Sequence, residues 1–242
     1  MLSFEDFAKM AKNENLKSYE KVGFGKVHRE EKEQFIFPDI KAKILSEGNI
    51  EIIVDIGCGC SKPVFDLIDF CKIERERVKE LVLVDSKEML NNIKNEEKFI
   101  KKFDLKFPDK EFVELYKNKV DVIIIYSVLH HVYFHQNFIE FLDSAVALLK
   151  EGGRLLIGDI PNLSKKKRFL SSQFGREFHK SFSGEYPENV KCIDFQEKAI
   201  QDDLIFMILQ RYRLMGFETY LLPQNENLPL CYTREGILIR KW

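Results

Sequence analysis

The chain has 242 residues, 45% of them hydrophobic, and its 38 Lys and Arg residues nearly balance 39 Asp and Glu residues. This apolar content is enough for a core and excludes an intrinsically disordered protein, and the chain-wide basic excess that marks many nucleic-acid binders is missing. The length fits one large domain, or one domain with a sizeable insertion. Five cysteines in a chain this long do not resemble a secreted disulfide framework.

The first residues, MLSFEDFAKMAK, carry acidic side chains early and no long apolar run, so we expect no signal peptide. The apolar stretch at 204–209 is far too short to cross a bilayer. We therefore expect a cytoplasmic protein with no membrane partner. The spacing of Cys58, Cys60 and Cys71 matches no common zinc site, and we expect no metal.

Apolar runs alternate along the chain with segments of helical spacing. Several runs, such as VDVIIIY, are apolar at successive positions, which is typical of strands covered on both faces. The alternation predicts a doubly wound, Rossmann-like α/β sheet of seven strands, mostly parallel, with an antiparallel C-terminal hairpin strand. The expected strands are 51–56, 80–85, 99–104, 120–126, 153–160, 217–222 and 236–240.

Three segments between these runs have the ends and spacing of helices. One carries Pro63 in its first turn, the second has an apolar stripe over 138–149 stopped by Gly152, and the third follows Asp202 and ends before Gly216.

Two segments do not fit the alternation. Residues 1–50 precede the first strand and are expected to form a helical cover, with two helices around KVGFGK. Residues 162–198 form an insertion within the main domain, 51–242, and long irregular insertions are often lids or binding loops.

The first strand ends in VDIGCGCS, where Gly57 and Gly59 permit unusual dihedrals and close approach of a ligand to the main chain. In a doubly wound sheet such a turn lies in the ligand-binding crevice. A plain tight turn remains an alternative. A nicotinamide dinucleotide fits poorly, because Lys62 stands where its fingerprint has a third glycine.

An acid at the tip of the second strand strengthens the case for an adenosine cofactor. Asp85 ends LVLVD, 28 residues beyond Gly57 (85 − 57), where its carboxylate can accept hydrogen bonds from both ribose hydroxyls. A helix-capping role for Asp85 is the plainer interpretation, and the two roles can coexist.

Four segments in order, VDIGCGCS, LVLVDSKEML, VDVIIIYSVLHHV and LLKEGGRLLIGDIP, resemble the motifs of class I S-adenosylmethionine-dependent methyltransferases. They are most similar to the small-molecule branch with S-x-L-H-H after the fourth strand. The resemblance covers 51–161 well and 216–240 less closely. Ser61 stands where many members carry a third glycine.

The resemblance implies that the cofactor is S-adenosyl-L-methionine, with the Gly57–Gly59 backbone facing its methionine part and Asp85 binding the ribose. It implies cofactor contacts from Asp55, Gly57, Cys58, Gly59, Asp85, Ser86, Met89, Asp104, Leu105, Tyr126 and Ser127.

Methyl transfer to a hydroxyl or an ammonium also needs a base that removes a proton. His130 and His131 follow the fourth strand and are the best candidates, because histidine ordinarily titrates near neutral pH; His131 is slightly favoured. Each could instead pack against or cap the next helix. The candidate catalytic residues are His131, His130, Tyr126 and Asp159. His179, in the insertion, is more simply a surface residue.

The insertion carries eight Lys and Arg and five Asp and Glu residues, a net charge of +3. This hints at an anionic acceptor, although charge runs usually face water. We therefore expect a methyltransferase acting on an O or N atom of a small polar metabolite, with nucleic acid as an unfavoured partner. Tyr19, Phe24 and Arg29 of the N-terminal segment are weaker candidates for contacts with the cofactor or the substrate. The alternatives are an RNA methyltransferase and a non-catalytic protein that binds the cofactor.

Overall fold

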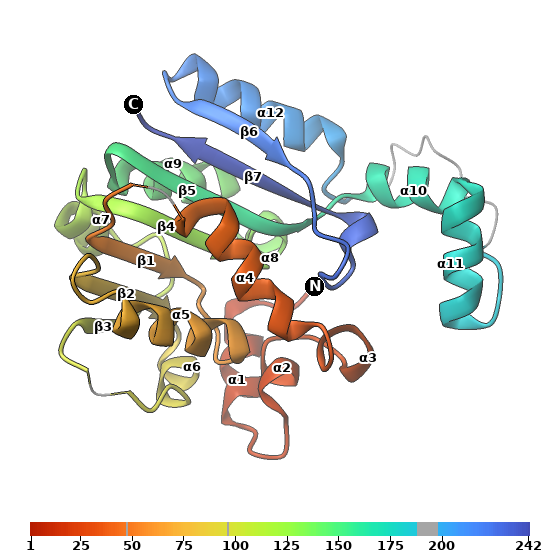
Figure 1. Ribbon diagram of the computed structural model, residues 1–242, viewed down its shortest axis with the longest axis horizontal. Helices are drawn as coiled ribbons and strands as arrows, with labels where there is room; N and C mark the ends of the chain where they lie inside the picture. The colour runs from red at the N-terminus through yellow and green to blue at the C-terminus, as the bar shows by residue number, and fades with distance from the viewer. Residues whose placement is uncertain (47, 96, 188–197) are drawn as a thin grey trace.

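The computed structural model describes residues 1–46, 48–95, 97–187 and 198–242, which fold around a seven-stranded sheet of order β3-β2-β1-β4-β5-β7-β6. Strands β1 to β5 pair in parallel, and β7 runs antiparallel to both β5 and β6 (Figure 1). The predicted Rossmann-like sheet with a C-terminal hairpin is thereby confirmed. The strands are β1 (Ile52–Ile56), β2 (Glu80–Asp85), β3 (Ile100–Asp104), β4 (Val120–Tyr126), β5 (Leu149–Pro161), β6 (Glu218–Leu222) and β7 (Arg234–Arg240).

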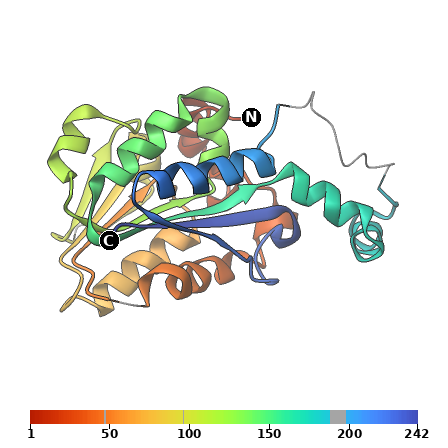
Figure 2. The same ribbon diagram turned by 90° about the horizontal axis from the view of Figure 1, so that it is seen from above.

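Helices cover both faces of the sheet, and Figure 2 shows the sheet between two helical layers. Side chains of β4 alternate between the two resulting cores, because successive residues of a strand point to opposite faces. One core packs against α4 (Ile36–Ile40), α5 (Lys62–Ile73) and α6 (Lys87–Asn91). The other packs against α7 (Lys110–Tyr116), α8 (Leu129–His135), α9 (Phe138–Leu148) and α12 (Asp202–Leu214).

The end of α9 differs from the sequence-based expectation. The helix ends at Leu148, because Leu149 is already extended and pairs with Val120 in the sheet. The next pair in the ladder joins Val122 to Arg154, so Gly152 lies in an irregularity of β5 and does not stop the helix.

The N-terminal segment contains more helices than the two expected. It folds as α1 (Phe4–Lys12), α2 (Ser18–Lys21), α3 (Lys26–Arg29), α4 and two short irregular helical turns, 33–35 and 41–45. Two turns divide this segment. One follows Lys12, and the other is at Gly23, where the Gly23 N–H donates a hydrogen bond to the Glu20 carbonyl. The result is a folded cap whose α1 packs against α6.

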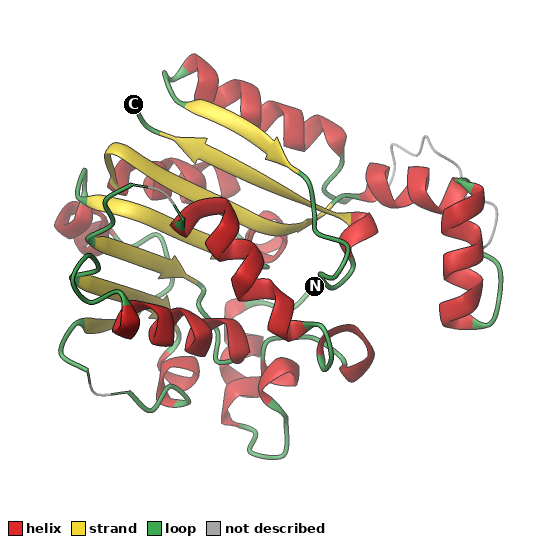
Figure 3. Ribbon diagram, viewed as in Figure 1, coloured by secondary structure: helices red, strands yellow, loops and turns green. Residues whose placement is uncertain are grey.

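The segment after β5 forms α10 (Leu163–Ser171) and α11 (Gln173–Ser183), which extend beyond the strands at the end where β5 finishes (Figures 1 and 3). Part of the expected insertion, 188–197, lies outside the described residues. None of the helices in the described ranges is long and apolar enough to cross a membrane.

Candidate active site

A cavity of about 150 Å³ lies at the carboxyl ends of β1, β2 and β4. Strand order reverses between β1 and β4, and open α/β sheets bind ligands at such a switch point. Its first side, here called the strand-end wall, contains the predicted residues Asp55, Gly57, Cys58, Gly59, Asp85, Met89, Leu105, Tyr126 and Ser127. Its second side, the cover wall, comes from the N-terminal helices and contains Phe4, Phe7, Val22, Phe24 and Arg29.

The glycine turn after β1 needs its glycines for two reasons. Gly57 and Gly59 have φ of 74° and 61°, in the left-handed region that costs other residues energy. A Cβ on Gly57 would also lie 2.5 Å from Cγ2 of Val128, and a Cβ on Gly59 would lie 2.7 Å from Cγ1 of Val22. Side chains from the segment after β4 and from the N-terminal cover therefore leave no room for a Cβ at either glycine.

Asp85 joins the glycine turn to the tip of β2. Its two oxygens accept hydrogen bonds from the Gly59 N–H (2.8 Å) and the Ser86 N–H (2.7 Å). Burial raises the pKa of this carboxyl to about 6, against the effect of those donors. Each carboxylate oxygen can accept more than one bond, so both can still receive ligand hydroxyls.

Asp55 is buried in the same wall. Burial, together with the charge of Asp85, raises the pKa of Asp55 to about 8. No cationic side chain in the described ranges forms an ion pair with it. A buried carboxyl without a counter-charge is suited to a cationic ligand group.

Two of the predicted cofactor residues cap α6 and do not line the cavity. The Ser86 hydroxyl accepts a hydrogen bond from the Met89 N–H, and the exposed Asp104 carboxylate accepts one from the Lys87 N–H at 2.8 Å. Their neighbours Met89 and Leu105 do line it. This side of the site therefore presents mainly apolar surface.

His131 lies in the cavity wall on α8. Its Nδ1 is 3.1 Å from the Leu2 carbonyl oxygen, and its ring meets Phe7 edge-on with 4.7 Å between centroids. A carbonyl can only accept a hydrogen bond, so Nδ1 carries the hydrogen and Nε2 is the basic nitrogen. Burial lowers the pKa of His131 to about 4, so the ring is neutral near pH 7.

The other predicted histidines lie outside the wall. His130 is buried with its ring centroid 4.1 Å from that of His131, and its Nδ1 has no partner within the described part of the chain. Burial lowers the pKa of His130 to about 2. His179 is on α11 and is half-buried. Of the three, His131 is the one placed for contact with a ligand.

The ends of β4 and β5 are held together by an unusual backbone arrangement. Ser127 and Asp159 both have positive φ, 61° and 55°, and the Ser127 hydroxyl donates to the Asp159 carboxylate. Strained non-glycine residues of this kind cluster at functional sites. Asp159 does not line the cavity; it forms an ion pair with Arg234 at 3.6 Å. It thereby fixes Ser127, which does line the cavity.

Tyr126 precedes Ser127 and lines the cavity with its ring against β5. A Cβ on Gly158 would lie 2.3 Å from its Cδ2 atom, so the ring occupies the space above the glycine. Burial raises the pKa of the phenol well above its usual range, so it stays protonated.

Sequence reasoning missed the packing of Val22 on Gly59 and the role of Val128, because no local pattern marks contacts between such distant segments. It also raised an anionic acceptor near the basic insertion as a hypothesis, beside the plainer interpretation that these charges face water. In the structure Lys165 lies 3.7 Å from Glu235 and Arg168 forms an ion pair with Asp202, and neither lines the cavity. Across the described residues, no cluster of three or more metal-ligating side chains occurs.

Residues 49–188, more than half of the chain, match a protein family described as methyltransferase domain. The chain belongs to this methyltransferase family. The matched residues include the glycine turn, the tip of β2 and both Ser127 and Asp159. Membership of this family makes the protein an enzyme, and its candidate active site lies at the switch point of the sheet, where such folds bind ligands. A search of curated proteins found no match.

Solved structures with this fold are also methyltransferases. A Haloferax volcanii protein, solved as the putative methyltransferase in a complex with the Trm112 methyltransferase activator, has TM-score 0.57 and 12% identity over 98% of this chain and 97% of that one. The N-methyltransferase NodS of Bradyrhizobium japonicum has TM-score 0.51 and 12% identity over 87% and 96%. The CurJ carbon methyltransferase has TM-score 0.53 and 13% identity over 85% of this chain, which spans 52% of that one. At such identities the likeness concerns the fold.

Proposed function

We propose that this methyltransferase transfers a methyl group from S-adenosyl-L-methionine to an O or N atom of a small polar metabolite, anionic acceptors included. The observation that carries the proposal is the strand-end wall. It combines a left-handed glycine turn, a carboxylate at the tip of β2 and apolar surface from Met89 and Leu105 around one cavity.

The residues of this wall suit that cofactor. Asp85 would accept hydrogen bonds from the ribose hydroxyls, Met89 and Leu105 would border the adenine, and Asp55 would face the ammonium group. The raised pKa of Asp55 supports this assignment, because a cation beside it would relieve its uncompensated burial. When bound, the cofactor supplies an activated methyl group on a sulfonium.

His131 would act as the base for a hydroxyl or ammonium acceptor. It is neutral at physiological pH and its Nδ1 hydrogen is fixed on the Leu2 carbonyl, so Nε2 keeps a lone pair for the proton. The burial that lowers the pKa of His131 also makes the ring a weaker base, so the assignment rests on its position in the cavity wall. Tyr126 and Ser127 would hold the acceptor beside the cofactor, with Ser127 oriented by Asp159. NodS is described as an N-methyltransferase and CurJ as a carbon methyltransferase, and both share the fold, so the fold does not identify the acceptor atom. The proposal of an O or N acceptor rests on His131.

Two measurements test the proposal. In a thermal-shift titration, S-adenosylhomocysteine should raise the melting temperature with concentration, while NADH and NADPH should not. Single-turnover transfer of a labelled methyl group to a panel of small alcohols, amines and carboxylates should then yield a product.

The variant His131→Asn keeps an amide donor for the Leu2 carbonyl and removes the base. We expect it to slow transfer about 10²- to 10⁴-fold, with unchanged binding of S-adenosylhomocysteine. Stabilisation by a nicotinamide cofactor alone would overturn the proposal, and equal rates in His131→Asn would remove the base from it.

A further inference from the structure

Arg29 is a buried arginine of the cover wall and lies on α3 of the N-terminal cap. Its exposed fraction is 3%, and it lines the cavity together with Phe24 and Ser127. The site described so far assigns no task to this charge. Burying a guanidinium is costly unless its donors are paired, so the partners of each nitrogen matter.

Three contacts fix the guanidinium. Nη1 lies 3.7 Å from a Glu33 carboxylate oxygen, Nη2 donates to the Ser127 hydroxyl at 3.2 Å, and the plane stacks on the Phe24 ring with 3.9 Å between Cζ and the centroid. Nε is buried and has no hydrogen-bond partner in the part of the chain that the structure describes. The group is thus held in place by an ion pair, one hydrogen bond and ring stacking, while its Nε–H is left without an acceptor.

The free donor belongs to the edge that arginine uses for carboxylates. Nε and Nη2 point to the same side of the guanidinium and form a fork that matches the two oxygens of a carboxylate. The chain provides an internal example, since Nε of Arg211 donates to one oxygen of Asp143 at 3.1 Å and Nη2 donates to the other. In Arg29 the same edge meets only a serine hydroxyl.

We propose that the Nε–Nη2 edge of Arg29 is a carboxylate-binding subsite of the cavity. The inference deepens the proposed function and rests on it for the identity of the ligand. The carboxylate comes either from the amino-acid part of the cofactor or from the acceptor. Glu33 holds the far side of the guanidinium and keeps it from swinging into solvent. With Asp55 in the strand-end wall, the cavity then offers a carboxyl group to the ammonium and a guanidinium to the carboxylate of a zwitterion.

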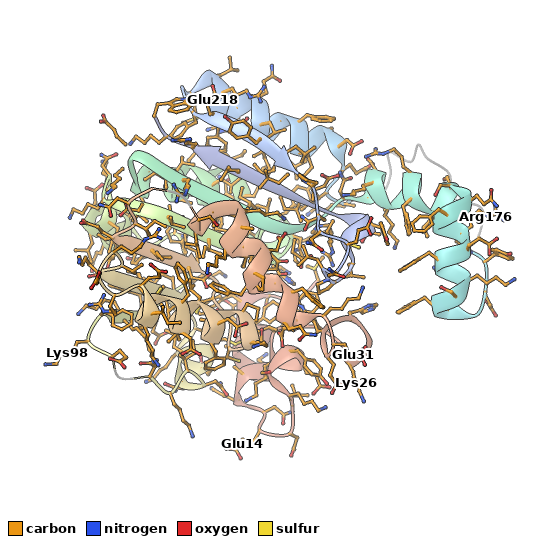
Figure 4. The ribbon with its side chains drawn as sticks, viewed as in Figure 1. Glu14, Lys26, Glu31, Lys98, Arg176 and Glu218 are labelled. Carbon is orange, nitrogen blue, oxygen red and sulfur yellow. The ribbon has the colours of Figure 1, made fainter. Side chains whose placement is uncertain are left out.

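The test compares two adenosine thioethers by calorimetry. S-adenosylhomocysteine carries the α-amino acid group, and 5′-methylthioadenosine lacks it. The variants are Arg29→Lys, which retains the charge beside Glu33 but loses the fork, and the double variant Arg29→Leu with Glu33→Leu, which leaves no orphaned buried charge. Lys26→Met is the matched control, because Lys26 lies on the same helix and points into solvent (Figure 4).

If the cofactor supplies the carboxylate, both Arg29 variants bind S-adenosylhomocysteine at least tenfold more weakly, and the affinity for 5′-methylthioadenosine changes less than twofold. If the acceptor supplies it, both affinities are retained. Sodium acetate then raises the melting temperature of the wild-type protein saturated with S-adenosylhomocysteine above that in sodium chloride of equal ionic strength, and the Arg29 variants lose this increment. Lys26→Met behaves as the wild type in either case.

Wild-type affinity for S-adenosylhomocysteine and a wild-type acetate response in the Arg29 variants would overturn the subsite and leave the proposed function intact. If the wild-type protein binds neither thioether, the proposed function fails instead. The acetate response of the ligand-free protein, compared between wild type and Arg29→Lys, then decides the subsite alone.

Discussion

The two walls of the cavity are built in different ways. The strand-end wall takes its residues from the ends of the parallel strands and the turns that follow them, with Met89 added from α6, so the ladder of the sheet positions this wall. The cover wall takes its residues from short helices that precede the sheet, and these are held by contacts such as Val22 on Gly59 and Arg29 on Ser127.

This difference separates two tasks. The strand-end wall has fixed geometry, which suits a cofactor that must be the same in every turnover. The cover wall has aromatic side chains and one buried cation, and it can vary without disturbing the sheet. Binding of the cofactor's ribose and adenine should therefore depend on the first wall. The second wall should influence the choice of acceptor and, through Arg29, the binding of a carboxylate.

The sharpest test of the strand-end wall is Asp85→Asn. The substitution removes the charge that would receive the ribose hydroxyls, and hydrogen bonds to charged groups contribute about 1.5–3 kcal/mol each. Affinity for S-adenosylhomocysteine should fall about 100-fold or more by calorimetry, since about 1.4 kcal/mol is a factor of ten. Asp104→Asn, at the end of the neighbouring strand, is the control and should leave the affinity unchanged. Equal losses in both variants would point to damage around α6.

The contact between the two walls can be tested through Gly59→Ala. The new Cβ would meet Val22 at 2.7 Å on a backbone with φ of 61°, which together should lower the free energy of unfolding by about 2–3 kcal/mol in urea melts. Adding Val22→Ala should restore the part due to the contact and leave the backbone cost. A double variant no more stable than Gly59→Ala would show that the cover does not press on the turn.

The charge state of Asp55 predicts a pH effect on the strand-end wall. With its pKa raised to about 8, the carboxyl is protonated at pH 6 and becomes charged as the pH rises to 8. Affinity for S-adenosylhomocysteine, which carries an ammonium group, should rise about tenfold over that window, a change of about 1.4 kcal/mol. The ligand-free protein should lose stability over the same window, because its folded form binds more protons than its unfolded form.

Asp55→Asn should flatten both pH dependences. Binding of 5′-methylthioadenosine, which has no ammonium group, serves as the ligand control. A rise in affinity that persists in Asp55→Asn would assign the effect to another group.

The smallest effect is expected outside both walls, in α10. Arg168 pairs with Asp202 at the surface, with 56% of its side chain exposed. Arg168→Ala should cost at most about 1 kcal/mol of stability, less at high salt, and should not change the affinity for S-adenosylhomocysteine. A clear loss of affinity would return the basic segment to the ligand site.

The sequence predicted most of the features that depend on residues close together in the chain. The seven strands agree within a few residues, because their apolar runs are buried on both sides, and the glycine turn and Asp85 stand where the motifs place them. The predicted end of α9 was wrong, because Leu149 already pairs with Val120 in the sheet before the chain reaches Gly152.

The cover wall could be foreseen only in outline. A helical cover was predicted for residues 1–50, and Phe4 and Phe7 of this segment line the cavity. The bond from Arg29 to Ser127 joins residues 98 positions apart, and no local pattern encodes such a pairing. The same holds for Val22 over Gly59, which depends on how the cap docks on the sheet.

The ring of Tyr126 against Gly158 has a practical consequence for anyone who wishes to retarget the enzyme. A side chain at 158 has no room, and a smaller residue at 126 would leave a void beside the strained Ser127. Saturation libraries at these two positions should yield mostly inactive clones. Diversity placed at Phe4 would reshape the other side of the cavity while the sheet stays as it is. Phe7 and Phe24 are less suitable positions, because their rings contact His131 and Arg29.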